Sequence, residues 1–153
     1  MTRKALFPGS FDPITKGHEA LVRRARTLFD EIIIGIGVNS DKKYLFDLDQ
    51  RVKWIEETFA DDVAIRVESY TGLTVNFAKE LDAGFILRGL RNSGDFQFEK
   101  GIAQMNKAMV PEVETVFLLT APELSAINSS IVRDIIRNGG DPSAFVPDAV
   151  TIG

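Results

Sequence analysis

The chain has 153 residues and lacks cysteine altogether, and it contains only one histidine and one tryptophan. Without cysteine there can be no disulfide framework, no thiolate nucleophile and no cysteine-ligated metal. One histidine among scattered carboxylates gives no protein cage for a metal. The apolar runs are too short for a signal peptide or a membrane span, so we expect a cytoplasmic protein without a membrane partner.

An excess of positive charge is also missing. The chain has 18 Lys and Arg against 22 Asp and Glu, for a net charge of −4 at pH 7. General nucleic-acid binders usually carry a basic face, so we expect no nucleic-acid partner. We find no linker, repeat or low-complexity segment, and the 44% hydrophobic residues are an ordinary globular share. We therefore expect a single domain over residues 1–153.

Several familiar nucleotide-binding and hydrolase patterns are absent as well. The chain has no GxxxxGK loop followed by Ser or Thr, and Gly35-Ile-Gly37 lacks the third glycine of a dinucleotide fingerprint. It has no GxSxG elbow either, so its serines form no hydrolase triad unless the single histidine serves them. The chemistry must therefore come from another arrangement.

Strand-like and helix-like patterns alternate along the chain. Apolar runs of strand length occur at residues 5–7, 31–38, 63–67, 85–87 and 113–119. Helical spacing follows His18, with Leu21, Ala25, Leu28 and Phe29 on one face. It starts again at an Asp47 capping box, and recurs at 73–81, at 102–109 and after Ser129, a candidate N-cap. This alternation predicts an α/β, Rossmann-like fold with a five-stranded parallel sheet and helices on both faces.

Ligands of such sheets bind outside the carboxyl ends of the strands. The segments that follow the predicted strands should therefore meet along one rim of the sheet. They are residues 8–18, 39–43, 70–74, 88–91 and 120–130.

Residues 9–18, GSFDPITKGH, are the most informative of these segments. They join a short apolar run to a helix start, which aims backbone N–H groups and a positive dipole end at a phosphate. Gly9 and Gly17 permit close approach, and Ser10 offers a hydroxyl. His18 adds a donor, although a helix-start histidine can equally make only a local hydrogen bond. We interpret the segment as a phosphate site, where a metal would be Mg²⁺ carried mainly by the ligand's phosphates.

Two arginines follow the predicted strand 85–87. Arg88 and Arg91 present planar guanidinium groups that suit phosphate oxygens bidentately. The alternative is a pair of surface arginines that bridge Asp95 and Glu99. Gly89 leaves room for a ligand against the backbone, which favours the phosphate interpretation.

Two further groups lie on the same predicted rim. Lys42 follows the second strand, where a loop lysine is either simply solvated or part of a site, and the sequence leaves both open. Asn128-Ser129-Ser130 opens the last helix and offers donors at a second positive helix end. Helix capping and anion binding use the same geometry there.

The segment Thr15-Lys16-Gly17-His18 resembles the T/H-x-G-H signature of the nucleotidyltransferase superfamily. A wider match is more specific. ALFPGSFDPITKGH, the Lys42 loop, ILRGLRNSGDFQFE and INSSIVRDI occur in the order and spacing of the bacterial phosphopantetheine adenylyltransferase family, from about Lys4 to Pro147.

The resemblance implies transfer of AMP from ATP to 4′-phosphopantetheine, giving dephospho-coenzyme A and pyrophosphate in coenzyme A biosynthesis. It also implies Mg²⁺ as cofactor, a homohexamer, and feedback by coenzyme A. The matching positions imply catalytic roles for His18, Lys42 and Arg91, and acceptor binding by Ser10, Lys42, Thr74 and Arg88. They imply ATP binding by Ser10, Phe11, His18, Gly89, Leu90, Arg91, Glu99, Leu124, Ser125, Ala126, Ile127, Asn128, Ser129 and Ser130.

This chain departs from the family pattern at five positions. Ser10 stands where threonine is common, which keeps the hydroxyl, and Thr74 stands where an apolar residue is common. Phe98 replaces a frequent tyrosine, Asn128 a frequent serine, and Leu124 a tryptophan of some members. A terminal helix seen in relatives is expected to be short or missing.

Two other functions remain open at the level of sequence. One is a sister nucleotidyltransferase that uses CTP or another phosphorylated acceptor. The other is a nucleotide-binding sensor that has the fold without turnover. The region around Phe96, Met105 and Met109 is either core or subunit interface, because periodicity does not distinguish them.

Overall fold

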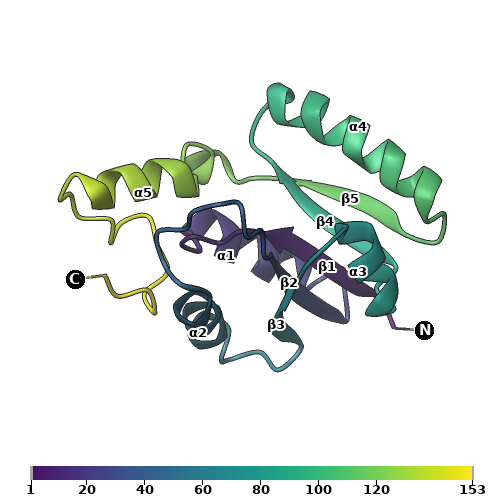
Figure 1. Cartoon of the computed structure of the whole chain (residues 1–153), viewed down its shortest axis with the longest axis horizontal. Coiled ribbons are helices and arrows are strands. Elements are labelled where there is room, and N and C mark those ends of the chain that lie inside the picture. The colour runs from purple at the N-terminus through teal and green to yellow at the C-terminus, as the bar shows by residue number, and fades with distance from the viewer. Residues whose placement is uncertain (1, 153) are drawn as a thin grey trace.

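The apolar runs of the sequence form one sheet at the centre of the molecule (Figure 1). The computed structural model describes residues 2–152. Its strands are β1 (Lys4–Gly9), β2 (Glu31–Gly37), β3 (Ile65–Tyr70), β4 (Phe85–Leu90) and β5 (Glu114–Leu119). Its helices are α1 (Lys16–Ala25), α2 (Leu48–Thr58), α3 (Thr74–Glu80), α4 (Ser93–Met109), the short 3-10 helix η1 (Pro122–Leu124) and α5 (Ser129–Arg137).

All five strands are parallel, and their order in the sheet is β3-β2-β1-β4-β5. The chain builds the sheet outward from β1 to β3 and then returns to place β4 on the other side of β1. Ala5 of β1 therefore pairs with Ile32 of β2 and with Phe85 of β4. The order reverses between β1 and β4, so a ligand crevice is expected at their carboxyl ends.

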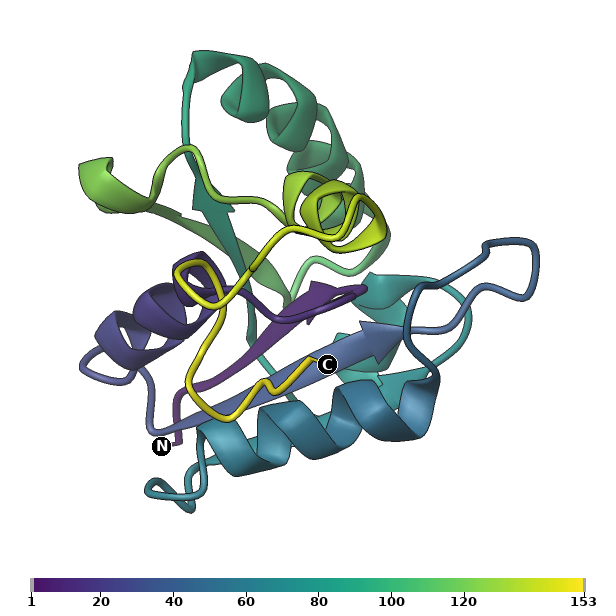
Figure 2. The same cartoon turned by 90° about the vertical axis from the view of Figure 1, so that its left-hand side faces the viewer.

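Side chains of β1 alternate between two hydrophobic clusters, one on each face of the sheet. Ala5 and Phe7 belong to the cluster covered by α1, α2, α5 and residues 146–150. Leu6 belongs to the other cluster, which contains Val75 of α3 and Val110 just after α4. The predicted Rossmann-like sheet with helices on both faces is confirmed (Figure 2).

α4 is the longest helix, with 17 residues, and its one buried residue is the charged Glu99. The helix lies at the β5 end of the sheet, away from α1 and α2 (Figure 1). Its outward side chains include Phe98 and Met105, which are 71% and 65% exposed, and Leu119 of the edge strand β5 is 72% exposed. Exposed apolar side chains therefore lie on both α4 and β5.

Several predicted boundaries were wrong. β3 and β4 run on to Tyr70 and Leu90, so Arg88 lies within β4 and not after it, and three other differences have a local reason. Val63 is fully exposed, and the third strand begins at Ile65 because residues 61–64 form a turn. Leu28 lies beyond α1 and is 43% exposed, since that helix ends at Ala25. Asn128, and not Ser129, caps α5, because Ser129 Oγ donates instead to the carbonyl of Pro13.

Other boundaries agree with the sequence. Asp47 caps α2 by accepting from the backbone N–H of Gln50. Residues 138–152 contain no further helix and run as irregular chain, with Val146 and Val150 packed into the first cluster. Across the described residues, no helix is long and apolar enough to cross a bilayer.

Candidate active site

The loop after β1 makes an abrupt turn before α1 begins. Phe11 has a φ of 48°, in the left-handed region, and the Asp12–Pro13 peptide bond is cis. The turn buries the Phe11 ring, which is 3% exposed, against the edge of the His18 ring with 4.9 Å between centroids. The Phe11 ring thereby packs against His18, and the loop holds the histidine at the carboxyl ends of β1 and β4.

Thr15 and His18 cap α1 reciprocally. The backbone N–H of His18 donates to Thr15 Oγ1 at 3.3 Å, and the backbone N–H of Thr15 donates to His18 Nδ1 at 3.0 Å. A nitrogen that accepts this bond carries no proton, so the neutral ring carries its proton on Nε2. The cap therefore determines which ring nitrogen is the donor.

The surroundings of His18 keep its ring neutral. Burial lowers its pKa to about 4, and the positive charges of Arg88 and Arg91 act in the same direction. At neutral pH the side chain is thus a neutral N–H donor and not an imidazolium. Charge stabilisation fits this state better than proton transfer.

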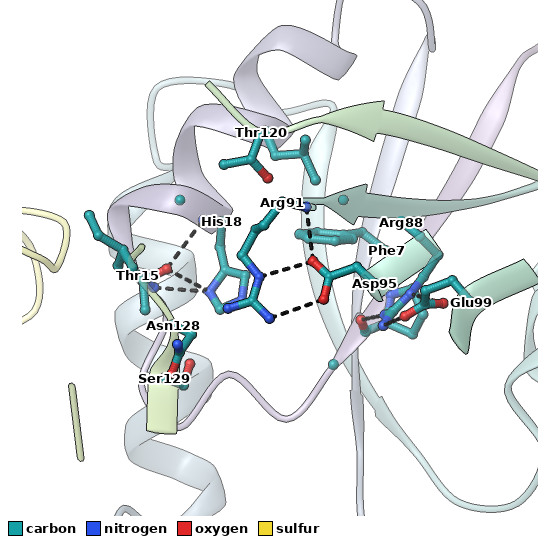
Figure 3. Close-up of a pocket in the computed structure, with 16 residues that line it drawn as sticks. Phe7, Thr15, His18, Arg88, Arg91, Asp95, Glu99, Thr120, Asn128 and Ser129 are labelled. Carbon is teal, nitrogen blue, oxygen red and sulfur yellow. Dashed lines mark hydrogen bonds and ion pairs between the residues drawn. The ribbon is translucent and has the colours of Figure 1, made fainter. Parts of the chain in front are cut away.

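The Nε2 side of His18 faces a cavity of about 270 Å³ at the ends of β1 and β4 (Figure 3). We call it the nucleotide pocket, after the ligand that the sequence leads us to expect there. The N-termini of α1 and α5 both contribute to its wall through Gly17 and Ser129. Within residues 2–152, the backbone N–H groups of these two residues have no acceptor. Free first-turn N–H groups at two positive helix ends suit an anion.

Both arginines of the rim are paired with carboxylates at this pocket. Arg88 donates from Nε and Nη2 to Glu99 at 3.1 and 2.6 Å, and from Nη1 to the Pro8 carbonyl at 2.8 Å. Arg91 donates to Asp95 from Nε at 3.1 Å and from its backbone N–H at 2.9 Å. The two contacts proposed as the alternative to phosphate binding therefore exist, and all four side chains line the pocket.

These pairs hold the arginines in place without using all their donors. A guanidinium has five N–H donors, so Arg88 keeps two after its three bonds. Burial opposes the charged form of Asp95, but hydrogen bonds from Arg91 outweigh it and lower the pKa of that carboxyl. Asp95 is thus an anionic support that orients Arg91.

A second cavity of about 310 Å³, the acceptor pocket, shares part of its wall with the nucleotide pocket. The shared residues are Pro8, Gly9, Arg88 and Glu99. Its remaining wall is more apolar, with Ile86, Phe98, Ile102 and Ala103. The Tyr70 hydroxyl and Thr74 Oγ1, 2.7 Å apart, add one hydrogen-bonded polar pair.

Lys42 and Ser10 meet beside the acceptor pocket. Lys42 Nζ donates to Ser10 Oγ at 3.1 Å, although 32 residues separate them in the chain. Ser10 itself lines the acceptor pocket. A lysine and a hydroxyl next to Arg88 form a group of donors suited to a phosphate.

The pockets bring together most, but not all, of the predicted site residues. The nucleotide pocket contains His18, Arg88, Gly89, Arg91, Glu99, Ile127, Asn128 and Ser129, and the acceptor pocket contains Ser10, Thr74, Arg88 and Glu99. Lys42 lies outside both pockets and is connected to the acceptor pocket through its bond to Ser10. Phe11, Leu90, Leu124, Ser125, Ala126 and Ser130 also line neither. Phe11 instead packs under His18, and the roles of the other five stay predictions.

Sequence reasoning did not single out Thr120, Tyr70 or Asn106 as lining residues. Thr120 and Tyr70 lie in segments that the rim rule had selected, so their place was available from topology. Asn106 lies in the last turn of α4 and gave no signal, because its face of the helix could be assigned only from the packing.

No three His, Asp or Glu side chains among residues 2–152 lie together as a metal site. The two carboxylates of the nucleotide pocket, Asp95 and Glu99, are each engaged by an arginine. A metal at this pocket would therefore depend on ligands that the substrate brings.

Known proteins are similar to this chain in sequence and in fold. A sequence model of the cytidylyltransferase-like family matches residues 6–135. Phosphopantetheine adenylyltransferase of Flavobacterium psychrophilum is 58% identical over 150 residues, which cover 98% of this chain and 99% of that protein. The enzyme of the same name from Lachnoclostridium phytofermentans is 46% identical over 95% of this chain and 89% of its own length.

One solved structure, the Plasmodium falciparum nicotinic acid mononucleotide adenylyltransferase complexed with NaAD, matches with a TM-score of 0.70. The match covers 95% of this chain and 91% of that chain at 15% sequence identity. At this identity the likeness shows a shared fold and nothing finer.

Proposed function

The chain belongs to the phosphopantetheine adenylyltransferase family of nucleotidyltransferases, and we propose that its two joined pockets transfer AMP from ATP to 4′-phosphopantetheine. The products are dephospho-coenzyme A and pyrophosphate, in coenzyme A biosynthesis. The observation that carries this proposal is the shared wall of Pro8, Gly9, Arg88 and Glu99. It would bring the phosphate of one substrate next to the α-phosphate of the other.

Each pocket suits one substrate. The nucleotide pocket has two helix N-termini, His18 and Arg91 for the triphosphate. The acceptor pocket has an apolar wall for the pantetheine arm, with Thr74 available to the arm's amides. Ser10, Lys42 and Arg88 would hold the acceptor phosphate where the two pockets join.

The transfer needs positioning and charge stabilisation more than it needs a base. A phosphate monoester is already anionic near neutral pH, so its oxygen can attack the α-phosphorus directly. As that bond forms, the bond from the α-phosphorus to the bridging oxygen breaks, and pyrophosphate leaves with the electron pair. The Nε2–H of His18, Lys42 and Arg91 would stabilise the charge that develops.

We propose Mg²⁺ as the cofactor, held by the phosphate oxygens of ATP and by water. The arginine-paired state of Asp95 and Glu99 supports a metal that binds through its substrate. Bound there, it would neutralise charge on the pyrophosphate leaving group. Activity should disappear with EDTA and return with Mg²⁺, whereas activity that persists in EDTA would contradict this.

We propose further that copies of the chain assemble through the exposed apolar side chains of α4 and β5, as a homohexamer. The exposure of Met105 and Leu119 supports an interface, since exposed apolar side chains that gather on a surface often mark contact sites. Sedimentation should give six times the chain mass of 16.9 kDa, and Met105→Asp should reduce the assembled fraction. A wild-type monomer would contradict it.

We propose feedback by coenzyme A, and the two joined pockets support it. Coenzyme A contains an adenine nucleotide and a pantetheine arm, so one molecule would occupy both. Inhibition should weaken as either substrate is raised, and its absence at saturating coenzyme A would contradict the proposal. The cytoplasmic location expected from the sequence stays a prediction.

The reaction is tested with wild-type protein, ATP or CTP with Mg²⁺, and three acceptor conditions. They are 4′-phosphopantetheine, pantetheine without its phosphate, and no acceptor. We expect pyrophosphate only from ATP with 4′-phosphopantetheine. Pyrophosphate release with CTP but not with ATP would identify a sister enzyme. ATP binding without pyrophosphate release under any condition would identify a sensor.

A further inference from the structure

Arg51 of α2 is a buried arginine that makes no ion pair with a carboxylate within residues 2–152. Its exposed fraction is 2%. Burying an unpaired charge is costly, so the groups that bind it must compensate. Its Nε donates to the Phe46 carbonyl at 3.0 Å and its Nη1 to the Ser10 carbonyl at 2.8 Å. The guanidinium also lies 4.1 Å from the centroid of the Tyr44 ring.

Asp12 makes the complementary connection from the loop after β1. It too is 2% exposed, and its carboxylate accepts from the backbone N–H groups of Leu45 and Phe46 at 2.8 and 2.9 Å. Arg133 of α5 donates to the Asp12 carbonyl at 2.9 Å. Asp12 and Arg51 thus both bind the short segment 44–46, Asp12 through backbone N–H groups and Arg51 through the Phe46 carbonyl and the Tyr44 ring. We call these residues the Asp12–Arg51 clasp.

The clasp holds the backbone that presents Lys42. The Tyr44 hydroxyl accepts from the backbone N–H of Asn39 at 3.3 Å and donates to the Gly37 carbonyl at 3.4 Å. The same tyrosine ring is covered by Arg51 and lies 5.6 Å from Lys42 Nζ. The Tyr44 side chain therefore connects the start of the segment 37–44 with its end.

Arg51 also fixes the group that Lys42 reaches. Its bond to the Ser10 carbonyl holds the backbone of the residue whose hydroxyl accepts from Lys42. A lysine side chain has four flexible carbons and loses much entropy when it is held at one point. Because the backbones of Ser10 and of the Lys42 loop are already held, less of this entropy loss remains to be offset by substrate binding.

We propose that Arg51 is a positioning residue for AMP transfer, and that it acts by setting the separation of Ser10 and Lys42. Arg51 lines neither pocket, so it acts only through these two groups. The inference rests on the proposed function, because it assumes that they bind the acceptor phosphate. Tyr44 carries the effect from Arg51 to the lysine loop.

The test compares Arg51→Met with and without Lys42→Ala. Arg51→Met should lower kcat/KM for 4′-phosphopantetheine roughly ten- to a hundredfold, because small misplacements of binding groups are costly. The KM for ATP should stay within about twofold. With Lys42→Ala present, the further loss should fall below about threefold, since a residue that acts through Lys42 has little left to position.

Arg26→Met is the matched control. Arg26 is a half-buried arginine that, unlike Arg51, pairs with a carboxylate: it is bonded to Asp62 at 2.7 Å and to the Phe29 carbonyl at 2.7 Å, and it lines neither pocket. Its effect should be small and the same with or without Lys42→Ala. Tyr44→Leu, in the exposed loop, provides a second variant if Arg51→Met does not fold. It should show the same dependence on Lys42.

Wild-type pyrophosphate release is measured first, and its absence would reject the proposed function itself. If the wild-type protein is active, the variants that fold test the positioning role of Arg51. Equal losses with and without Lys42→Ala would overturn the positioning role, as would an unchanged acceptor kcat/KM in Tyr44→Leu. A loss that depends on Lys42 supports it.

Discussion

The backbone N–H of Thr15 donates to Nδ1 of His18 at 3.0 Å, and this bond leaves the ring's proton on Nε2, facing the nucleotide pocket. The contact is local, three residues apart on the first turn of α1. It nevertheless decides the chemistry of the side chain, because a ring held this way can donate to an anion without becoming charged.

His18→Ala should lower kcat by on the order of 10²–10³, the usual cost of losing one preorganised donor in a transition state. Steady-state pyrophosphate release at saturating substrates measures it, and thermal unfolding checks that the variant is folded. The KM values should change much less than kcat. An unchanged kcat would remove His18 from the reaction.

The imidazole of His18 should titrate near pH 4 in the free protein, well below the ordinary histidine pKa of 6.5. Burial, together with Arg88 and Arg91, makes the charged form costly. The chain has one histidine, so a single set of imidazole NMR signals reports it without assignment. Titration near pH 6.5 would show that the ring is solvated and would contradict the neutral donor.

The same lowered pKa predicts how stability depends on pH. Between about pH 6.5 and pH 4 the unfolded state binds a proton at His18 and the folded state does not, so the free energy of unfolding falls as pH falls. His18→Gln should remove this contribution to the pH dependence. The slopes of the free energy of unfolding against pH should then differ between wild type and variant by up to about 1.4 kcal/mol per pH unit. Denaturant titrations at several pH values measure it, and parallel curves would contradict it.

Thr74→Val should raise the KM for 4′-phosphopantetheine about tenfold, the worth of roughly one hydrogen bond. The kcat and the KM for ATP should remain unchanged, because Thr74 lines only the acceptor pocket. Thr74→Ser keeps the hydroxyl next to Tyr70 and serves as the control. A valine variant that behaves like the serine variant would show that the hydroxyl is not used.

Much of the fold could be predicted because its strands are buried on both faces. Ile32, Ile33, Ile34 and Ile36 of β2 are all fully buried, and such a run reads as a parallel strand from sequence alone. The start of β3 could not be predicted, since Val63 is a residue type common in strands but lies in a turn. Local propensity does not specify where a strand begins to pair.

The site could be predicted in outline but not in its pairings. Topology placed His18, Arg88 and Ser129 on one rim. The choice between phosphate binding and pairing with carboxylates turned out not to be exclusive for Arg88, because Glu99 binds it at the wall of both pockets. Such a contact joins β4 to α4 and depends on packing that no short pattern records.

The reason for the glycine at position 35 also depends on packing that no short sequence pattern shows. Its segment was rejected as a dinucleotide fingerprint, and the structure supplies a different reason for the glycine. A side chain there would come within 2.7 Å of Leu6 and 3.1 Å of the Tyr70 ring. The glycine makes room for Tyr70, whose hydroxyl reaches Thr74 in the acceptor pocket.

The central claim is that the α-phosphate of ATP moves to the acceptor, and tracing a phosphorus label tests it most directly. The protein is incubated with Mg²⁺, 4′-phosphopantetheine and ATP labelled either at the α- or at the γ-phosphate. We predict that the α-label appears in dephospho-coenzyme A and the γ-label in pyrophosphate. A γ-label in the acceptor product, or an α-label that remains in free adenine nucleotides, would contradict the account.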